Sequence, residues 1–203
     1  GVRVGRVEID IGGFGRREMA PYSDVDLLFL FKKDADKSPE FISGVLHPLW
    51  DLAFDVGHSS RTVTEVVKMA REDVESCTAM MDGRLLAGSA ELFADYQQRL
   101  FSRVPKNVPV QLNKWRRARI DNKDSVQLLE PNVKESPGGL RDIQTLEWAM
   151  KARAGQPDVS SLWSRYLEAA DVEIIARGRA FLWRVRHQMH FEIGRKRDLL
   201  EQD

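Results

Sequence analysis

The sequence predicts an α+β fold, in which a domain with a small mixed sheet is followed by an all-helical domain. The sheet is predicted by three short segments interpreted as strands, Val7–Ile11, Val25–Phe31 and Val56–Thr62. The helical domain is predicted by apolar residues that recur at spacings of three and four from Ser89 onward. Pro105 interrupts this periodicity near the middle of the 203-residue chain and indicates a boundary between two domains.

The domain boundary is expected near Val104, which divides the chain into residues 1–103 and residues 104–203. In the first domain, one helix is expected over Pro39–Phe54, since proline suits the first helical turn. A second helix should follow Thr64, whose hydroxyl can cap backbone N–H groups. The helices expected in the second domain are Val110–Lys123, Leu140–Arg153 and Asp171–Gly194.

The first two predicted strands, Val7–Ile11 and Val25–Phe31, are joined by a segment too short for a parallel crossover. We therefore expect them to be antiparallel neighbours. That pairing would place the glycine turn after the first strand and the carboxylates that open the second strand at the same end of the sheet.

The glycine turn at residues 12–15 is a candidate phosphate-binding loop. Because they lack a β-carbon, Gly12 and Gly13 allow backbone N–H groups to approach a triphosphate closely. The helix that follows would present its positive N-terminal end to the anion, and Arg16 and Arg17 are expected in its first turn. A P-loop would need Gly-Lys-Ser/Thr, and a dinucleotide-binding turn would need G-x-G-x-x-G, so the sequence contains neither motif here.

Asp24 and Asp26 are candidate catalytic residues and metal ligands. At positions i and i+2 of a strand, both side chains point to one face of the sheet. Two ionised carboxylates repel each other by roughly 4 kcal/mol at about 4 Å and an effective dielectric near 20. Magnesium (Mg2+), which prefers carboxylate and phosphate oxygens, relieves this repulsion. Each motif alone could be an ordinary loop or turn, but together they indicate phosphoryl or nucleotidyl transfer.

The run Gly-Gly-Phe-Gly-Arg-Arg-Glu-Met-Ala-Pro-Tyr-Ser-Asp-Val-Asp-Leu-Leu-Phe-Leu, residues 12–30, resembles the bacterial PII signal protein uridylyltransferase/uridylyl-removing enzymes. Further similar segments are residues 48–62, 130–145, 181–186 and 194–195. The resemblance implies a polymerase β-like nucleotidyltransferase fold and transfer of UMP from UTP to a tyrosine hydroxyl of a PII protein in nitrogen regulation. Proteins of this family are longer and carry HD hydrolase and ACT domains, so we expect the sequence to be a fragment.

The resemblance also implies a third carboxylate, for which there are two candidates. Asp82, in Asp82-Gly83-Arg84-Leu85, resembles the Asp-x-Arg-Leu element of glutamine synthetase adenylyltransferases, whose aspartate completes the metal site. Asp55, at the entry to the third strand, is the alternative. Asp82 is favoured, and its other interpretation is a turn residue that pairs with Arg84 and binds nothing.

Other polar residues could contact phosphate. His58 and Arg61 lie on the third predicted strand, although a lone histidine is more often structural. In the second domain, Lys134 and Arg141 flank a Ser-Pro-Gly-Gly turn that opens a helix, an arrangement able to hold an anion. Because the resemblance covers this turn, we expect both residues to bind the nucleotide. The alternative is that this region only stabilises the start of its own helix, with Asp142 as a cap.

A histidine pair near the C-terminus has two interpretations. His187 and His190, at i and i+3 with Glu192 nearby, could suggest a metal site. On an amphipathic helix that also carries Phe181 and Trp183, packing is the simpler explanation.

The composition restricts the partners and the compartment. The 31 basic and 31 acidic residues give a formal net charge of zero, which does not favour a nucleic-acid partner. The lone Cys77 excludes a disulfide framework and suits a reducing compartment. No apolar run is long enough to span a membrane, and no signal peptide opens the chain. We therefore expect a cytoplasmic protein without membrane or nucleic-acid partners.

The predicted function is nucleotidyl transfer, with UTP and a PII protein as partners. Two alternatives remain open. The chain could be a catalytically silent nucleotide-binding or regulatory module, or a nucleotidyltransferase of the same fold that acts on another acceptor. Metal-dependent incorporation of labelled UMP into a PII protein distinguishes these functions.

Overall fold

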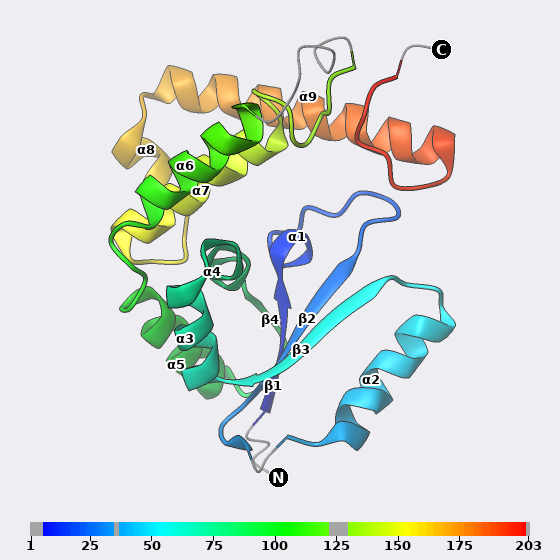
Figure 1. Ribbon diagram of the computed structural model, residues 1–203, viewed down its shortest axis with the longest axis vertical. Coiled ribbons are helices and arrows are strands. Elements are labelled where there is room, and N and C mark those ends of the chain that lie inside the picture. The colour runs from blue at the N-terminus through cyan, green and yellow to red at the C-terminus, as the bar shows by residue number, and fades with distance from the viewer. Residues whose placement is uncertain (1–5, 35–36, 122–129, 202–203) are drawn as a thin grey trace. The chain divides into compact units, whose positions relative to one another are not determined.

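The computed structural model describes residues 6–34, 37–121 and 130–201 (Figure 1). These residues belong to two compact units. The first unit contains Gly1–Met19 and Ser23–Pro105, and the second contains Ala20–Tyr22 and Lys106–Asp203. The short segment Ala20–Tyr22 therefore packs with the second unit, although in sequence it lies within the first.

A four-stranded mixed sheet organises the first unit. Its strands are β1 (Arg6–Ile11), β2 (Val25–Phe31), β3 (Val56–Thr62) and β4 (Arg84–Gly88), in the order β3-β2-β1-β4. β1 is antiparallel to β2 and to β4, whereas β2 and β3 are parallel. The predicted antiparallel pairing of the first two strands is confirmed, and the pairing of Ile11 with Asp26 brings the glycine turn next to the carboxylates.

The fourth strand, β4, was not predicted. Its sequence Arg-Leu-Leu-Ala-Gly contains no β-branched or aromatic residue, so it lacks the composition that identifies strands. Its position comes from pairing with β1, and that pairing is interrupted by an irregularity between Glu8 and Ile9.

The helices of the first unit are α1 (Gly12–Gly15), α2 (Pro39–Asp51), α3 (Val63–Glu72), α4 (Val74–Met81) and α5 (Ala90–Phe101). The predicted cap at Thr64 is wrong, because α3 begins at Val63 and Thr62 is its N-cap. The Thr62 hydroxyl accepts a hydrogen bond from the Glu65 amide at 3.3 Å, and the Glu65 carboxylate accepts one from the Thr62 amide at 2.6 Å. This reciprocal capping box satisfies two backbone donors and fixes the start of the helix.

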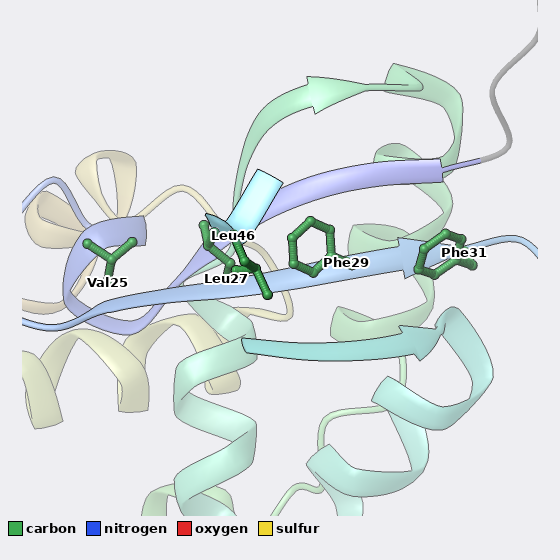
Figure 2. Close-up of a cluster of buried hydrophobic side chains, with 5 residues drawn as sticks. All are labelled: Val25, Leu27, Phe29, Phe31 and Leu46. Atoms are coloured by element: carbon green, nitrogen blue, oxygen red, sulfur yellow. The ribbon is translucent and has the colours of Figure 1, made fainter. Parts of the chain in front are cut away.

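One face of β2 forms a hydrophobic core with α2. Figure 2 shows its members, alternate residues of β2 together with one leucine of α2: Val25, Leu27, Phe29, Phe31 and Leu46. Because side chains alternate along a strand, Asp26 points to the opposite face. The core therefore fixes the strand that presents this carboxylate.

The second unit is described by α6 (Val108–Asp121), α7 (Leu140–Ala154), α8 (Ser160–Tyr166), α9 (Ala169–Ile193) and an isolated antiparallel bridge between Asn132 and Leu199. The three helices expected from periodicity are present, and α8 is an additional short one. The end of the expected helix Val110–Lys123 lies outside the described residues. Within the described part of the chain, no helix is both long and apolar enough to cross a membrane.

Candidate active site

The glycine turn follows β1 directly and forms α1, a single helical turn. Gly12 has φ +62°, a left-handed conformation that glycine adopts without the strain other residues incur. Gly15 is buried, and a β-carbon at this position would overlap the carbonyl oxygen of Asp82 and stand 2.9 Å from that of Asp10. At Gly13 a β-carbon would make only ordinary contacts, the nearest at 3.5 Å. The turn is therefore shaped by close backbone packing on both sides.

Arg16 and Arg17 do not lie in the first turn of a helix, as the sequence had predicted. The helix α1 ends at Gly15, and Arg16 is its C-cap because the chain leaves the helix after one turn. The Arg16 guanidinium donates from Nε to Glu18 at 2.8 Å and from Nη1 to Asp82 at 2.5 Å. Its described contacts therefore connect the end of the glycine turn to the segment before β4.

Two ion pairs connect residues around the start of β4 to the glycine turn and to β1. Arg16 pairs with Asp82, while Arg84 pairs with Asp10 and also donates to the carbonyl oxygen of Phe14. Both aspartate side chains are fully buried. Burial raises the pKa of Asp10 to about 6, although the charge and hydrogen bond of Arg84 oppose the rise.

These pairs correct one sequence interpretation and reveal a missed residue. Asp82 does not pair with Arg84, because each of the two has its own partner in the glycine turn or in β1. Asp10 was not singled out from the sequence. In the sequence Arg-Val-Glu-Ile-Asp-Ile of β1, Asp10 lies on the polar face of the alternation, where Glu8 gives the same local signal.

Asp26 lies within β2, near its start, whereas Asp24 lies just before the strand, so strand alternation does not fix its direction. Asp24 is exposed and directly precedes the strand, and Asp26 is half-buried within it. A β-carbon at Gly12 would stand 3.5 Å from Oδ2 of Asp26, and one at Gly57 would stand 2.6 Å from Oδ1. The Asp26 carboxylate thus lies between the glycine turn and β3. Gly57 was missed by sequence reasoning, since its role depends on the pairing of β2 with β3.

The donor chemistry at this end of the sheet suits Mg2+. Asp24 and Asp26 offer carboxylate oxygens, and Mg2+ typically takes one or two carboxylates and completes its shell with phosphate oxygens and water. Over residues 6–34, 37–121 and 130–201, no group of three or more histidine, cysteine, aspartate or glutamate residues is arranged to hold a metal ion. Of the candidates for a third carboxylate, Asp82 is bound to Arg16 and Asp55 is exposed. A metal-binding role for Asp82 stays a prediction.

The two polar candidates on β3 face opposite sides of the sheet. His58 pairs with Leu27, and its ring contacts Phe29 at a centroid distance of 6.4 Å, on the face that packs against α2. Arg61 pairs with Leu30 and so lies on the same face as Asp26. Its Nε is buried without a hydrogen-bond partner among the described residues. Of the two, Arg61 is therefore the one on the face of the carboxylates.

Lys134 and Arg141 make their described contacts within the second unit. Arg141 donates from Nε to Glu135 at 3.2 Å and from Nη1 to Gln144 at 3.0 Å. Its guanidinium also lies 5.4 Å from the ring centroid of Trp148. Burial, together with the neighbouring Arg141 charge, lowers the pKa of Lys134. Nucleotide binding by either residue stays a prediction.

Asp142 organises the turn that opens α7. Its carboxylate accepts hydrogen bonds from Arg116 at 2.9 and 3.0 Å, from Arg119 at 2.7 Å and from the backbone amide of Gly138 at 2.9 Å. The Ser-Pro-Gly-Gly turn is thus held by contacts of its own unit.

Comparison with known proteins identifies relatives over almost the whole chain. Residues 109–203 match the sequence model of the family described as GlnD PII-uridylyltransferase. The chain is 40% identical over 200 residues to the bifunctional uridylyltransferase/uridylyl-removing enzyme of Cereibacter sphaeroides, and 40% identical over 202 residues to that of Ruegeria pomeroyi. It is 38% identical over 196 residues to the corresponding protein of Ectopseudomonas mendocina. These alignments cover 94 to 95% of this chain but 22% of each relative, so the chain spans about a fifth of their length.

Proposed function

The chain belongs to the family of bifunctional uridylyltransferase/uridylyl-removing enzymes, and from this premise we propose that it contains their nucleotidyl-transfer site. In this proposal the chain transfers UMP from UTP to a hydroxyl group of a PII signal protein, with Asp24 and Asp26 at the centre of the site. The names of the related enzymes indicate transfer of a uridylyl group, and the name of the family indicates PII as the acceptor. The site proposed for the reaction is formed by residues of this chain.

The observation that carries the proposal is the proximity of Gly12 and Asp26. A β-carbon at Gly12 would stand 3.5 Å from Oδ2 of Asp26, so this carboxylate lies close beside the backbone of the glycine turn. A triphosphate that approaches the turn would have its oxygens within reach of a cation on Asp26. Glycine is favoured at position 12 because φ there is +62°, a conformation that residues with a β-carbon rarely adopt.

Each part of the site has a distinct task in this reaction. The backbone of the glycine turn would hold the phosphates, and the buried ion pairs Arg16–Asp82 and Arg84–Asp10 would keep that turn in place. Asp24 and Asp26 would hold Mg2+, which neutralises phosphate charge when bound. The acceptor hydroxyl oxygen then forms a bond to the α-phosphorus, the bond to the bridging oxygen of pyrophosphate breaks, and the hydroxyl proton is released.

Positioning and charge stabilisation account for catalysis in this scheme. The protein forms no covalent bond to the nucleotide, and its contribution is to align the acceptor oxygen with the α-phosphorus. Fixed dipoles and cations at the site stabilise the charge that develops on the phosphate oxygens.

The test compares Asp26→Asn and Asp24→Asn with the parent chain in the transfer of labelled UMP from UTP to a PII protein, with and without magnesium. Each substitution should abolish transfer while leaving thermal stability unchanged or slightly raised, because it removes a negative charge from the pair. Asp51→Asn, at the exposed end of α2, is the matched control and should retain full activity. Unchanged turnover in either site variant would overturn the assignment.

Two further measurements separate this proposal from its alternatives. UTP with magnesium at 100 times its dissociation constant should stabilise the parent by about 2.7 kcal/mol, and CTP, ATP and GTP provide the comparison. Stabilisation by UTP without transfer to any acceptor would identify a silent nucleotide-binding module. Transfer to a small molecule or tRNA, but not to PII, would identify a different acceptor.

A further inference from the structure

The segment Ala20–Tyr22 links the glycine turn to the strand that carries the candidate metal ligands. It ends two positions before Asp24, yet it packs with the second unit rather than with the sheet. Ala20 is buried, and Tyr22 has φ +61°, an unusual conformation for a residue with a side chain. The path of the chain into Asp24 is therefore held by contacts outside the sheet.

One of these contacts is a hydrogen bond to His190 of α9. The imidazole of His190 is completely buried, and its Nδ1 lies within hydrogen-bond distance of the carbonyl oxygen of Pro21. Its Nε2 lies 3.0 Å from Oδ1 of Asp198. Both ring nitrogens of His190 are thus occupied, and the sequence-based interpretation of this histidine as a packing residue is incomplete.

Asp198 is itself held by several donors. Arg186 donates to both carboxylate oxygens, from Nε at 2.6 Å and from Nη2 at 3.2 Å. The backbone carbonyl of Asp198 accepts from the amide of Val133 at 2.8 Å. Although burial opposes ionisation, the hydrogen bond and charge of Arg186 hold the pKa of Asp198 below its usual value. The orientation of His190 is therefore set by an ionised carboxylate that is fixed at both its side chain and its backbone.

The Pro21 carbonyl oxygen can only accept a hydrogen bond, so Nδ1 of His190 donates in this contact. On the other side of the ring, the contact of Nε2 with Asp198 fixes the direction in which Nδ1 points.

We propose that His190 is a positioning residue for nucleotidyl transfer, which holds Pro21 and thereby directs Asp24 and Asp26 into the geometry that binds magnesium. This inference rests on the proposed function of the two aspartates. Arg186 and Asp198 orient the imidazole, and His190 itself touches neither the nucleotide nor the metal. The second unit thus influences the carboxylates through the chain that precedes them.

The test uses two substitutions that divide the contacts of His190 in the 203-residue chain. In His190→Asn, the side-chain amide can replace Nδ1 and keep the bond to Pro21. In His190→Gln, the longer side chain can replace Nε2 and keep the bond to Asp198 but not the bond to Pro21. His187→Gln, one turn away on α9, is the matched control.

The first readout is amide hydrogen exchange, which does not depend on activity. Exchange over residues 20–26 should rise by about tenfold in His190→Gln, the upper end of the effect expected for the loss of one hydrogen bond. It should stay near the parent value in His190→Asn and His187→Gln. Protection in α7 reports whether each variant keeps its fold.

The second readout is metal binding and turnover. His190→Gln should weaken Mn2+ binding, measured by electron paramagnetic resonance, and raise the magnesium concentration needed for half-maximal transfer, with recovery in His190→Asn. Unchanged exchange over residues 20–26 in His190→Gln would overturn the inference, and so would raised exchange with unchanged Mn2+ affinity. If the parent binds Mn2+ but transfers no UMP, the proposed function fails while exchange and Mn2+ binding still decide the role of His190.

Discussion

A β-carbon at Gly57 would stand 2.6 Å from Oδ1 of Asp26. The two residues are paired across the parallel strands β3 and β2, so the space above Gly57 is where the carboxylate lies. No real β-carbon approaches an oxygen so closely without displacing it. Gly57 therefore sets the orientation of Asp26 from the neighbouring strand.

Gly57→Ala should impair catalysis far more than stability. The added methyl group meets only the end of a side chain, so Asp26 can rotate away and the free energy of unfolding should change by about 0.5 kcal/mol or less. Turnover should fall by about 10- to 100-fold, because moving a catalytic group by about 1 Å can lower the rate by about 100-fold. The measurement is UMP transfer as a function of magnesium concentration.

Gly44→Ala is the control for this prediction. Gly44 lies in α2, and a β-carbon there would meet no atom within 4 Å. It should raise stability by roughly 0.5 to 1 kcal/mol, the usual gain for alanine over glycine in a helix, and leave transfer unchanged. Full activity in Gly57→Ala would refute the link between Gly57 and Asp26.

The two glycines of the turn should respond differently to alanine. Gly12→Ala places a side chain at φ +62° and should cost about 1 to 2 kcal/mol of stability. Gly13→Ala has ordinary space within the protein, so its stability should be unchanged. If the turn binds phosphate, Gly13→Ala should nevertheless weaken UTP binding in calorimetry. Normal UTP affinity in this stable variant would exclude close approach of the nucleotide at Gly13.

The main features of the first unit could be predicted because they depend on local sequence. Alternation along β2 and the short connection to β1 were sufficient to place Asp26 beside the glycine turn. The N-cap of α3 could also have been predicted from the local sequence. Thr62 precedes Glu65 at the spacing of a capping box, whereas Thr64 does not.

The contacts that hold the site residues in place could not be predicted, because they join residues that are far apart in the sequence. Arg16 and Asp82 are 66 positions apart, and nothing in the sequence near either residue identifies the other. The role of Gly57 required the register of β3 against β2. The contact of His190 with Pro21 spans 169 positions and depends on the packing of the second unit. Such pairings are properties of the tertiary structure.

The stability of the chain should depend on pH through Asp10. Burial raises its pKa from 3.8 to about 6 in the folded protein. Between these values the folded state keeps a proton that the unfolded state has released, so the contribution of Asp10 to stability falls as pH rises. In urea unfolding at pH 4 to 6, the free energy of unfolding of the parent should fall relative to that of Asp10→Asn as the pH increases.

The comparison between parent and variant is necessary because burial also raises the pKa of Glu8. Glu8→Gln serves as the control and should leave the Asp10 contribution in place. A stability difference between parent and Asp10→Asn that does not change over this pH range would show that Asp10 is already ionised.

The ion pair of Arg16 and Asp82 should be more important for stability than any surface pair. Their side chains are 11% and 0% exposed, so removing one partner leaves a buried charge. Arg16→Met should cost about 3 to 5 kcal/mol, Asp82→Asn should cost less because Arg16 keeps its pair with Glu18, and the double variant should cost less than the sum. Asp95→Asn, which breaks the half-exposed pair with Arg99, should cost about 1 kcal/mol or less.

The same variants test whether Asp82 is also a metal ligand. If Asp82 only supports the glycine turn, Arg16→Met and Asp82→Asn should change the magnesium requirement of transfer to the same extent. A much larger increase for Asp82→Asn than for Arg16→Met would instead assign its carboxylate to the metal.

The contacts of Arg141 favour a structural role over nucleotide binding. Its guanidinium bonds to Glu135 and Gln144 and lies over the rings of Trp115 and Trp148. Arg141→Ala should therefore lower stability by about 1.5 to 3 kcal/mol, the usual contribution of hydrogen bonds to charged groups, and leave UTP affinity unchanged in calorimetry. Arg141→Lys keeps the charge but not the planar group, so it should also lose stability. A decrease of more than tenfold in UTP affinity for Arg141→Ala, with affinity kept in Arg141→Lys, would show instead that the charge of Arg141 binds the triphosphate.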